Sequence, residues 1–399
     1  MNVRKHIGIL CLSVFLFVIS CSENDVQPTN EVLIDSELFL SRDVNDLKSF
    51  IAASNLNLDV ALLEYSVDIY KINYKTTYLD DVITASGLVI LPKTEDPVPM
   101  VSFQHGTITA DSEAPTKQAL SSTELILYAG IAAPGFIGVI PDFIGFGSSA
   151  EVFHPYYVES LTASSIVDNL KAAKELAMEK GLSFNGNLFL AGYSQGGYAT
   201  MATHKYIETE GLPDFNLVAS FPAAGGYDVK AMQEYFFGLD TYDNPYYIAY
   251  VAMAYKTTFG WSDPLTDFFK EPYASRIPDL FNGSNSSGTI NSQLTNNISD
   301  LLTDDAIANF ETGTKYENLR NAFLDNSLVN WTPKVKIFMY HGDADITVPF
   351  DNSVITYNKL IDNGASTDIL KFFVIEGGTH STGVIPYIED FIPKMLDLK

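Results

Sequence analysis

A five-residue segment with glycine at both ends constrains the fold of this chain more than any other feature. Residues 192–196 read Gly-Tyr-Ser-Gln-Gly, directly follow the apolar run 188–191 and precede a stretch with helical spacing. This order predicts a strand, a tight turn and a helix, with Ser194 on the turn. Any side chain at Gly192 or Gly196 would crowd such a turn, so both positions require glycine. A chain of this length contains the pattern by chance about one time in ten, so the surrounding sequence has to support it.

The rest of the chain alternates short apolar runs with amphipathic stretches. A helix is predicted over residues 43–54, and period-two alternation then predicts a hairpin with arms at 65–78 and 82–91. Residues 160–180 and 196–209 have helical spacing. Apolar runs of strand length lie at 100–103, 137–140, 188–191, 217–221, 335–340 and 370–375. Strands that alternate with helices form a parallel sheet covered on both faces. The predicted fold class is therefore α/β, with a mostly parallel central sheet and an antiparallel N-terminal hairpin.

A long insertion is predicted within this α/β core. Residues 228–333 are rich in Tyr and Phe, and several prolines interrupt them. Because a structureless loop of roughly 100 residues is improbable inside a compact domain, a mostly helical insertion over the sheet is predicted here. Its aromatic residues either fill a small core of their own or line an apolar substrate pocket as a lid. The core then comprises residues 31–227 and 334–399.

Residues 1–20 have the pattern of an export signal, because two basic residues precede an apolar run too short to cross a bilayer comfortably. The run ends in Val-Ile-Ser-Cys, which resembles a bacterial lipobox, so Cys21 is the predicted lipidation site. Residues 21–30 would then form the lipid anchor and a disordered tether. The acidic residues that follow Cys21 resemble the surface-export signals of some Gram-negative outer-membrane lipoproteins. The alternative is an ordinary secretory signal that leaves Cys21 as an unpaired cysteine.

The charge of the chain restricts its partners. The formal net charge is −25, and nucleic-acid binding is excluded because phosphate contacts need clustered Lys and Arg. The sequence contains no metal-ligand spacing and no dinucleotide-binding glycine motif, so no cofactor and no metal are expected. The expected partner is a small-molecule or lipid ester, and contact with a membrane is expected only through the lipid anchor. The oligomeric state stays open.

A serine hydroxyl is a poor nucleophile at neutral pH and needs a base, which in turn needs an orienting acid. His380 and Asp345 are the predicted base and acid, because each lies in a loop after a predicted strand. Asp343 is the main competitor for the acid, but the pattern H-G-x-x-D-x-x-V-P favours Asp345. Glu376 is a more distant competitor.

The other histidines are weaker candidates for the base. His6 leaves with the signal, His154 lies in a loop, and His204 falls on the predicted helix after the serine. His341 is expected to order its own turn rather than to catalyse.

Attack by a serine creates an oxyanion, which needs preorganised N–H donors. The backbone N–H of Gln195 is the first candidate. The second donor is predicted in the loop after an earlier strand, at Thr107 or Gly106, where the missing side chain would let the backbone approach a substrate.

Together these motifs resemble the α/β-hydrolases, and most closely the secretory lipase family. Ser194, Asp345 and His380 also follow one another in the chain order of α/β-hydrolases. The resemblance covers about Tyr65 to the C-terminus and implies a helical cap after the nucleophile strand. It further implies hydrolysis of carboxylic esters through an acyl-enzyme on Ser194, as in a lipase or carboxylesterase. The same motifs also fit a polysaccharide-linked acetyl or feruloyl esterase, a serine peptidase of this fold, or an inactive surface binding protein.

Overall fold

The computed structural model describes residues 30–54 and 56–399. The predicted export signal, the lipidation site Cys21 and most of the predicted tether lie outside these residues.

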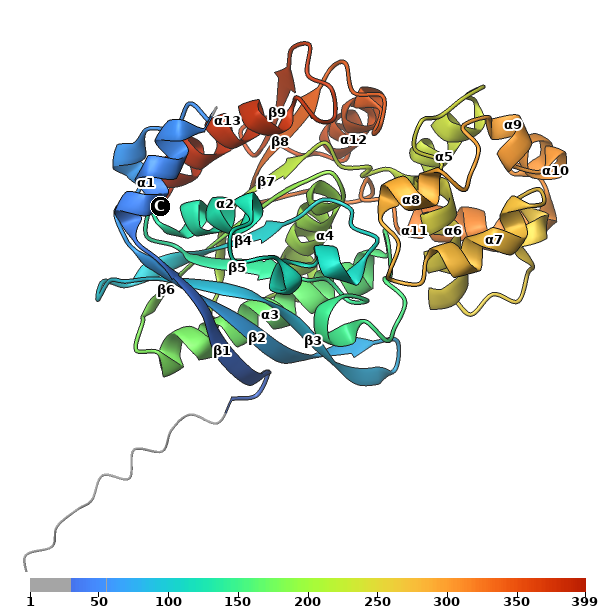
Figure 1. The fold of residues 1–399 in the computed structure, drawn as a ribbon. Coiled ribbons are helices and arrows are strands. Elements are labelled where there is room, and N and C mark those ends of the chain that lie inside the picture. The colour runs from blue at the N-terminus through green and yellow to red at the C-terminus, as the bar shows by residue number, and fades with distance from the viewer. Residues whose placement is uncertain (1–29, 55) are drawn as a thin grey trace, which may run out of the picture.

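Within the described residues, one nine-stranded sheet has the order β1-β2-β3-β5-β4-β6-β7-β8-β9 (Figure 1). The strands are β1 (Leu33–Arg42), β2 (Val67–Tyr78), β3 (Asp81–Pro92), β4 (Val98–Gln104), β5 (Ile137–Pro141), β6 (Phe184–Tyr193), β7 (Asn216–Ala223), β8 (Lys336–Gly342) and β9 (Leu370–Ile375). All pairs from β5 to β9 are parallel, whereas β1, β2 and β3 pair antiparallel and β3 joins β5 antiparallel. The predicted fold class and the predicted N-terminal hairpin are confirmed.

Strand β1 is the one strand of the described sheet that the sequence analysis did not predict. It pairs with β2 along its whole length, and most of its side chains are exposed or half-buried. An edge strand of this kind buries few side chains, so its sequence lacks a clear apolar alternation. The helix predicted over 43–54 is α1 (Val44–Ala53), and the Asp43 carboxylate caps it by accepting a hydrogen bond from the Asn45 N–H.

Helices cover both faces of the sheet. On one face α3 (Glu159–Glu179) and α4 (Gln195–Glu210) pack on the strands, and α12 (Phe350–Asp362) joins them. The other face carries α1, α2 (Thr123–Ala132) and α13 (Val384–Asp397). Alternation along β6 supplies both cores, since Leu188 and Leu190 face α3 whereas Phe189 and Ala191 face α2 and α13.

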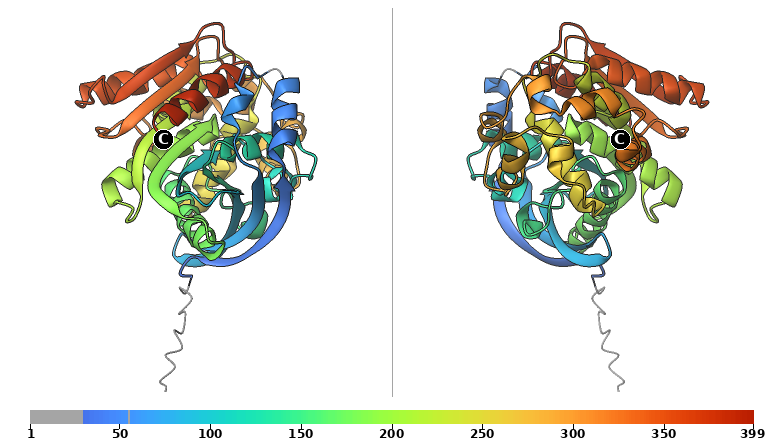
Figure 2. Two further views of the ribbon diagram at one scale, coloured as in Figure 1. Left: turned by 90° about the vertical axis from the view of Figure 1, so that its left-hand side faces the viewer. Right: turned by 90° about the vertical axis from the view of Figure 1, so that its right-hand side faces the viewer.

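The segment between β7 and β8 is helical, as the fold prediction expected, and we call residues 229–325 the helical insertion. Its helices are α5 (Val229–Phe237), α6 (Tyr246–Thr258), α7 (Tyr273–Leu280), α8 (Ser287–Asn291), α9 (Ile298–Leu301), α10 (Asp304–Asn309) and α11 (Glu317–Asp325). They lie together at one side of the sheet, in yellow and orange in Figures 1 and 2.

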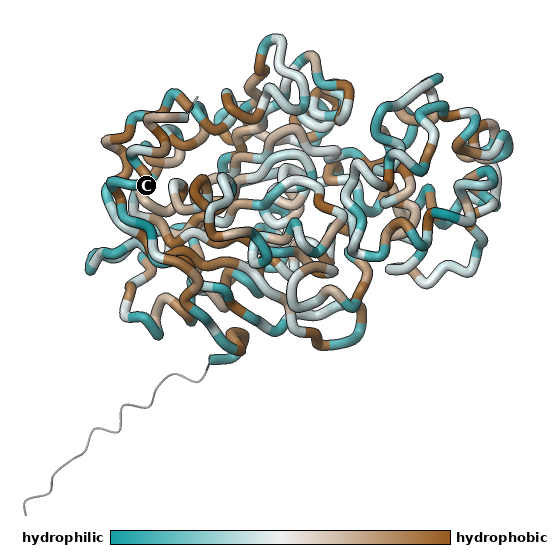
Figure 3. Tube along the Cα trace, viewed as in Figure 1, coloured by the Kyte–Doolittle hydropathy of each residue, from teal (hydrophilic) through white to brown (hydrophobic). Residues whose placement is uncertain are grey.

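Nearly all aromatic side chains of the helical insertion belong to, or pack against, one buried cluster that also contains sheet residues such as Ile337 and Met339. They therefore do not form a separate core, which was one of the two expectations for this segment. Figure 3 shows hydrophobic stretches along the strands and their covering helices, and hydrophilic stretches in many outer loops of the insertion. None of the helices in residues 30–54 and 56–399 combines the length and hydrophobicity that a membrane crossing requires.

Candidate active site

Ser194 sits between the end of β6 and the first residue of α4, in a strained backbone conformation with φ 61° and ψ −123°. A residue with a side chain rarely adopts such a positive φ, and strain of this kind is concentrated at functional sites. The hydroxyl is presented at the edge of the sheet where the parallel strands end. The strand, turn and helix predicted from the five-residue segment are all present.

Close backbone approach explains the glycines around this turn. A Cβ added at Gly192 would lie 2.3 Å from the carbonyl oxygen of Gly196, and one added at Gly196 would lie 1.9 Å from that of Gln104. A third glycine, Gly197, has the same constraint, because its added Cβ would lie 2.2 Å from the carbonyl oxygen of Ala223. Atoms cannot approach this closely, so the turn packs against β4 and β7 only with glycine at these positions.

Replacing Gly196 by alanine is therefore expected to destabilise the fold by roughly 3 kcal/mol or more, the upper end of the usual cost of overpacking. The backbone of Gln104 would have to move away from the added methyl group. Gly288 is a matched control, because it lies in helix α8 and an added Cβ meets nothing within 4 Å. Urea unfolding of both variants measures the difference, and an equal effect at the two positions would contradict the steric explanation.

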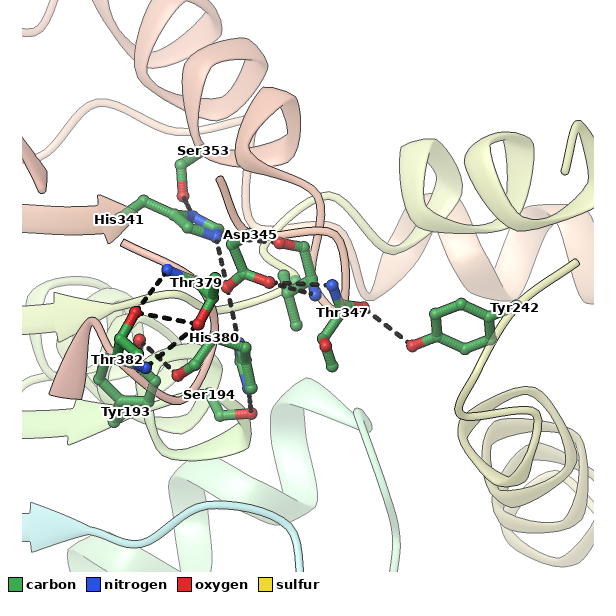
Figure 4. Close-up of polar contacts among 12 residues, drawn as sticks. Tyr193, Ser194, Tyr242, His341, Asp345, Thr347, Ser353, Thr379, His380 and Thr382 are labelled. Carbon is green, nitrogen blue, oxygen red and sulfur yellow. Dashed lines mark hydrogen bonds and ion pairs between the residues drawn. The ribbon is translucent and has the colours of Figure 1, made fainter. Parts of the chain in front are cut away.

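His380 lies in the loop after β9, and its Nε2 is 2.9 Å from Ser194 Oγ (Figure 4). Its Nδ1 is 2.6 Å from Asp345 Oδ2. Because a carboxylate only accepts, Nδ1 carries the proton and Nε2 is free to accept the hydrogen bond of the Ser194 hydroxyl. The loop is anchored at the same point, since the hydroxyl of Tyr193 donates to the backbone carbonyl of His380 at 2.9 Å. Three side chains far apart in the sequence thus form one hydrogen-bonded chain.

Asp345 is buried in the loop after β8 and accepts hydrogen bonds on both carboxylate oxygens. Its Oδ1 accepts from the backbone N–H groups of Thr347, at 2.9 Å, and Val348, at 3.1 Å. Burial by itself would raise the pKa of Asp345, but the hydrogen bonds from His341 and His380 outweigh burial and lower the pKa to about 2. The carboxylate is therefore ionised at neutral pH.

His341 has a role that the sequence analysis did not foresee. Its Nε2 lies 3.2 Å from Asp345 Oδ2 and 3.0 Å from the carbonyl oxygen of Val348. Both partners are acceptors, so Nε2 carries the proton and Nδ1 accepts from the hydroxyl of Ser353 at 2.6 Å (Figure 4). The expectation was that His341 orders its own turn, and its contacts also hold the carboxylate that faces His380.

Asp343 and Glu376 were the competitors for the acid, and His204 was one for the base. All three lie away from the hydrogen-bonded chain of Ser194, His380 and Asp345. Asp343 is exposed and accepts from the N–H of Gly377 at 2.7 Å, and Glu376 is exposed as well. His204 is buried on α4 against Ser220 and Glu208.

Two of the predicted oxyanion donors, Gln195 and Gly106, lie next to Ser194. Gln195 is the first residue of α4, where backbone N–H groups have no partner within the helix. A Cβ added at Gly106 would lie 3.8 Å from Ser194 Cβ, so the glycine leaves the space beside the serine open. The hydroxyl of Thr107 lies 2.8 Å from that of Tyr156.

The His154 side chain forms a hydrogen bond with the side chain of Gln195, a contact that the sequence did not indicate. Its Nδ1 donates to the carbonyl oxygen of Ile144 at 2.6 Å, and its Nε2 accepts from the side-chain amide of Gln195 at 2.7 Å. Burial lowers the pKa of His154 to about 4, so the ring is neutral at physiological pH. Its position in a loop carried no signal for this contact, because its partners lie 10 and 41 residues away.

Comparison with known families matches residues 111–382 to the secretory lipase family. The match covers more than half of the chain and includes Ser194, Asp345 and His380. The chain belongs to the secretory lipase family. It is thus a hydrolase that acts on esters, and membership indicates an exported protein. The sequence prediction of this family is confirmed, although the matched region begins later than Tyr65.

Solved structures with the same fold include known ester hydrolases. The rice cell wall degrading esterase LipA from Xanthomonas oryzae has a TM-score of 0.80 and 22% identity, with 93% of this chain and 98% of LipA covered. Candida antarctica lipase A in its closed state has a TM-score of 0.68 and 15% identity, with coverage of 92% and 83%. These similarities establish the α/β-hydrolase fold of this secretory lipase family member. A comparison with curated proteins found no match.

An apolar pocket of this secretory lipase family member opens on Ser194, with a cavity volume of about 90 Å³. Aromatic and aliphatic side chains from the core and from the helical insertion line it, among them Tyr156, Phe236 and Val348. The insertion also contacts the loop that carries Asp345, because the hydroxyl of Tyr242 donates a hydrogen bond to the carbonyl oxygen of Thr347 at 2.8 Å (Figure 4). The insertion thus lies over the serine and supplies much of the pocket wall.

Proposed function

We propose that this protein is an exported serine hydrolase that cleaves carboxylic esters, as a lipase or carboxylesterase does, through an acyl-enzyme on Ser194. The observation that carries the proposal is the hydrogen-bonded chain from Ser194 through His380 to Asp345, with distances of 2.9 and 2.6 Å. The strained backbone of Ser194 and the apolar pocket that opens on it also support the proposal.

In the first half of the reaction, Ser194 Oγ attacks the carbonyl carbon of the ester while its proton passes to His380 Nε2. The new C–O bond converts the carbonyl oxygen to an oxyanion. Asp345 stays ionised, holds Nδ1–H in place and stabilises the positive imidazolium. The proposed donors to the oxyanion are the backbone N–H of Gln195 and one from Gly106 or Thr107.

Collapse of this intermediate breaks the bond to the alcohol, which leaves with the proton from His380 Nε2. The acyl group remains on Ser194 Oγ. A water molecule then gives a proton to His380 and attacks the acyl carbon, and the second collapse returns that proton to Ser194 Oγ and releases the acid. The cycle consumes one ester and one water, and no step requires a cofactor.

The pocket favours an apolar acyl chain. Among the described residues that line it there is no Asp, Glu, Lys or Arg, and most of the lining side chains are aromatic or aliphatic. Such a wall gives a hydrocarbon chain favourable burial and leaves a charged group without a partner.

A fluorophosphonate probe tests the nucleophile directly. We expect the probe to react once per chain and to modify the peptide that contains Ser194, because its phosphorus is attacked by an activated serine. Mass spectrometry of the digested protein locates the adduct. An unmodified protein would favour the inactive binding protein, and an adduct on another residue would move the nucleophile elsewhere.

A polysaccharide-linked ester is the second candidate substrate, because LipA from Xanthomonas oryzae, which shares the fold, is described as a cell wall degrading esterase. A panel of p-nitrophenyl esters of different chain length, acetylated xylan, a feruloyl ester and a peptide anilide separates the candidates. The apolar pocket predicts the highest kcat/KM for the p-nitrophenyl esters, and faster cleavage of the xylan, feruloyl or peptide substrate would reverse this order.

We also propose that the mature protein is a Gram-negative outer-membrane lipoprotein that faces the cell surface and is anchored through Cys21. The lipobox-like sequence and the export signal support this proposal. The intact mass of the mature protein tests it, because a lipid-modified Cys21 adds the mass of its lipid, and the variant Cys21→Ser would lack it.

A further inference from the structure

A second apolar cavity, of about 310 Å³, lies on the face of the sheet that carries α1, α2 and α13. These three helices lie close together in Figure 1, in blue, teal and red. The walls come from these helices, from the segment after α1, and from the ends of β4 and β6. We call this space the α2–α13 cavity.

The lining of the α2–α13 cavity is mostly hydrocarbon, and His105, Tyr128 and Tyr193 are its uncharged polar members. Leu58, Leu127, Ile388 and Phe391 are representative apolar members. Its volume is at the lower end of the roughly 300–1,000 Å³ of small-molecule pockets. Water fills a cavity only where it finds two to four polar partners, whereas an apolar cavity of about half this size stays dry and binds apolar molecules. A space of this size and lining is therefore suited to an apolar occupant.

The charges at the cavity restrict that occupant further. Among the described residues that line the cavity, Asp59 and Glu124 are the charged ones, and both side chains are exposed. Two carboxylates at the rim repel an anionic head group, and the net charge of −25 adds to this repulsion. A free fatty acid is thus disfavoured relative to an uncharged amphiphile with the same chain.

The α2–α13 cavity approaches the active site without including its reacting groups. Gly106 and Tyr193 line the cavity, and Gly106 also lies beside Ser194. Ser194 itself lines the other pocket, on the side of the helical insertion. A molecule in the α2–α13 cavity would therefore be separated from Ser194 by the loop after β4, which contains Gly106.

We propose that the α2–α13 cavity is a second lipid-binding site, which holds one uncharged hydrocarbon chain such as that of a fatty alcohol or an acylglycerol. The inference does not depend on Ser194 being the nucleophile. It depends on the hydrocarbon lining, the volume and the acidic rim.

Gly130 offers a sharp test, because it lies in α2, lines the cavity, and an added Cβ meets nothing within 4 Å. The variant Gly130→Leu should extend its side chain into the cavity, because Leu127 and Ile131 on the same helix also line it. The probe is 10-bromo-1-decanol, an alcohol that an esterase cannot hydrolyse. Because the leucine takes the place of two or more methylene groups of the probe, we expect at least about tenfold weaker binding by calorimetry.

Gly288→Leu is the matched control, since it makes the same change at an open helical position far from the lining of the cavity, and it should bind the probe as the wild type does. Leu127→Phe provides a second variant that narrows the cavity from the same helix. Decanoate should bind the wild type more weakly than 1-decanol. In crystals grown with the probe, the bromine should lie between α2 and α13.

Bromine found only in the pocket on Ser194, or unchanged affinity in both Gly130→Leu and Leu127→Phe, would overturn the proposal. Equal binding of decanoate and 1-decanol would overturn the part that concerns charge. The same calorimetry on Ser194→Ala separates the two proposals. The variant should bind the probe in the α2–α13 cavity as the wild type does, whether or not Ser194 is the nucleophile of an esterase.

Discussion

Replacing Ser194 by alanine is expected to lower kcat for p-nitrophenyl butyrate by on the order of 10⁶-fold, the loss that follows removal of the nucleophile in a serine protease. The reason is chemical, since alanine has no oxygen to form the acyl-enzyme and His380 then has no proton to accept. The variant should fold normally. It removes one oxygen from a position where the backbone, rather than the hydroxyl, contacts the neighbouring strands.

Ser381→Ala is a suitable control, because Ser381 is exposed and directly follows His380. Its kcat should stay within about twofold of the wild type, as for most surface substitutions. Circular dichroism and thermal unfolding of both variants check that the fold is intact. Turnover retained by well-folded Ser194→Ala would show that ester cleavage takes place through another group.

The second large effect is expected for Asp345→Asn, which should lower kcat by roughly 10⁴-fold at neutral pH. The amide is nearly the same size as the carboxylate but uncharged, and it can donate to His380 Nδ1. It thereby favours the tautomer that places a proton on Nε2, where the proton of Ser194 must go. KM should change little, because the buried Asp345 side chain is not among the residues that line the pocket on Ser194.

Asp343→Asn makes the same change two residues away and decides between the two acids that the sequence offered. Asp343 is exposed, and the one hydrogen bond described for its side chain comes from the N–H of Gly377. We expect it to keep kcat within about twofold. Steady-state kinetics from pH 5 to 9 compares the variants. A large loss in Asp343→Asn together with a small loss in Asp345→Asn would assign the acid to Asp343.

The order of structural elements could be predicted from the sequence because it depends on local patterns. Period-two alternation defined the hairpin of β2 and β3, and short apolar runs located all six parallel strands to within a few residues. Strand β1 was missed because it lies at the edge of the sheet and buries few side chains. The helical insertion was foreseen from its length and composition, but the continuity of its aromatic cluster with the sheet was not.

The candidate site shows the same division at the level of single residues. Ser194, Asp345 and His380 could be proposed because each follows a strand, and parallel strands end at one edge of a sheet. The support from His341 and His154 could not be proposed, since each depends on side-chain contacts that no local pattern encodes. Gly197 was likewise overlooked, because its need for glycine comes from the carbonyl of Ala223 on another strand.

The sequence alone thus determined the α/β class, the family and the three side chains proposed to react. The tertiary structure decided how those groups are held, where the insertion contributes to the pocket, and that a second cavity lies between α2 and α13. The physical reason is the separation along the chain over which each kind of interaction acts. Backbone conformation and hydrophobic periodicity are set within a few residues, whereas hydrogen bonds such as that between Ser194 and His380 join atoms 186 positions apart and exist only after the sheet has assembled.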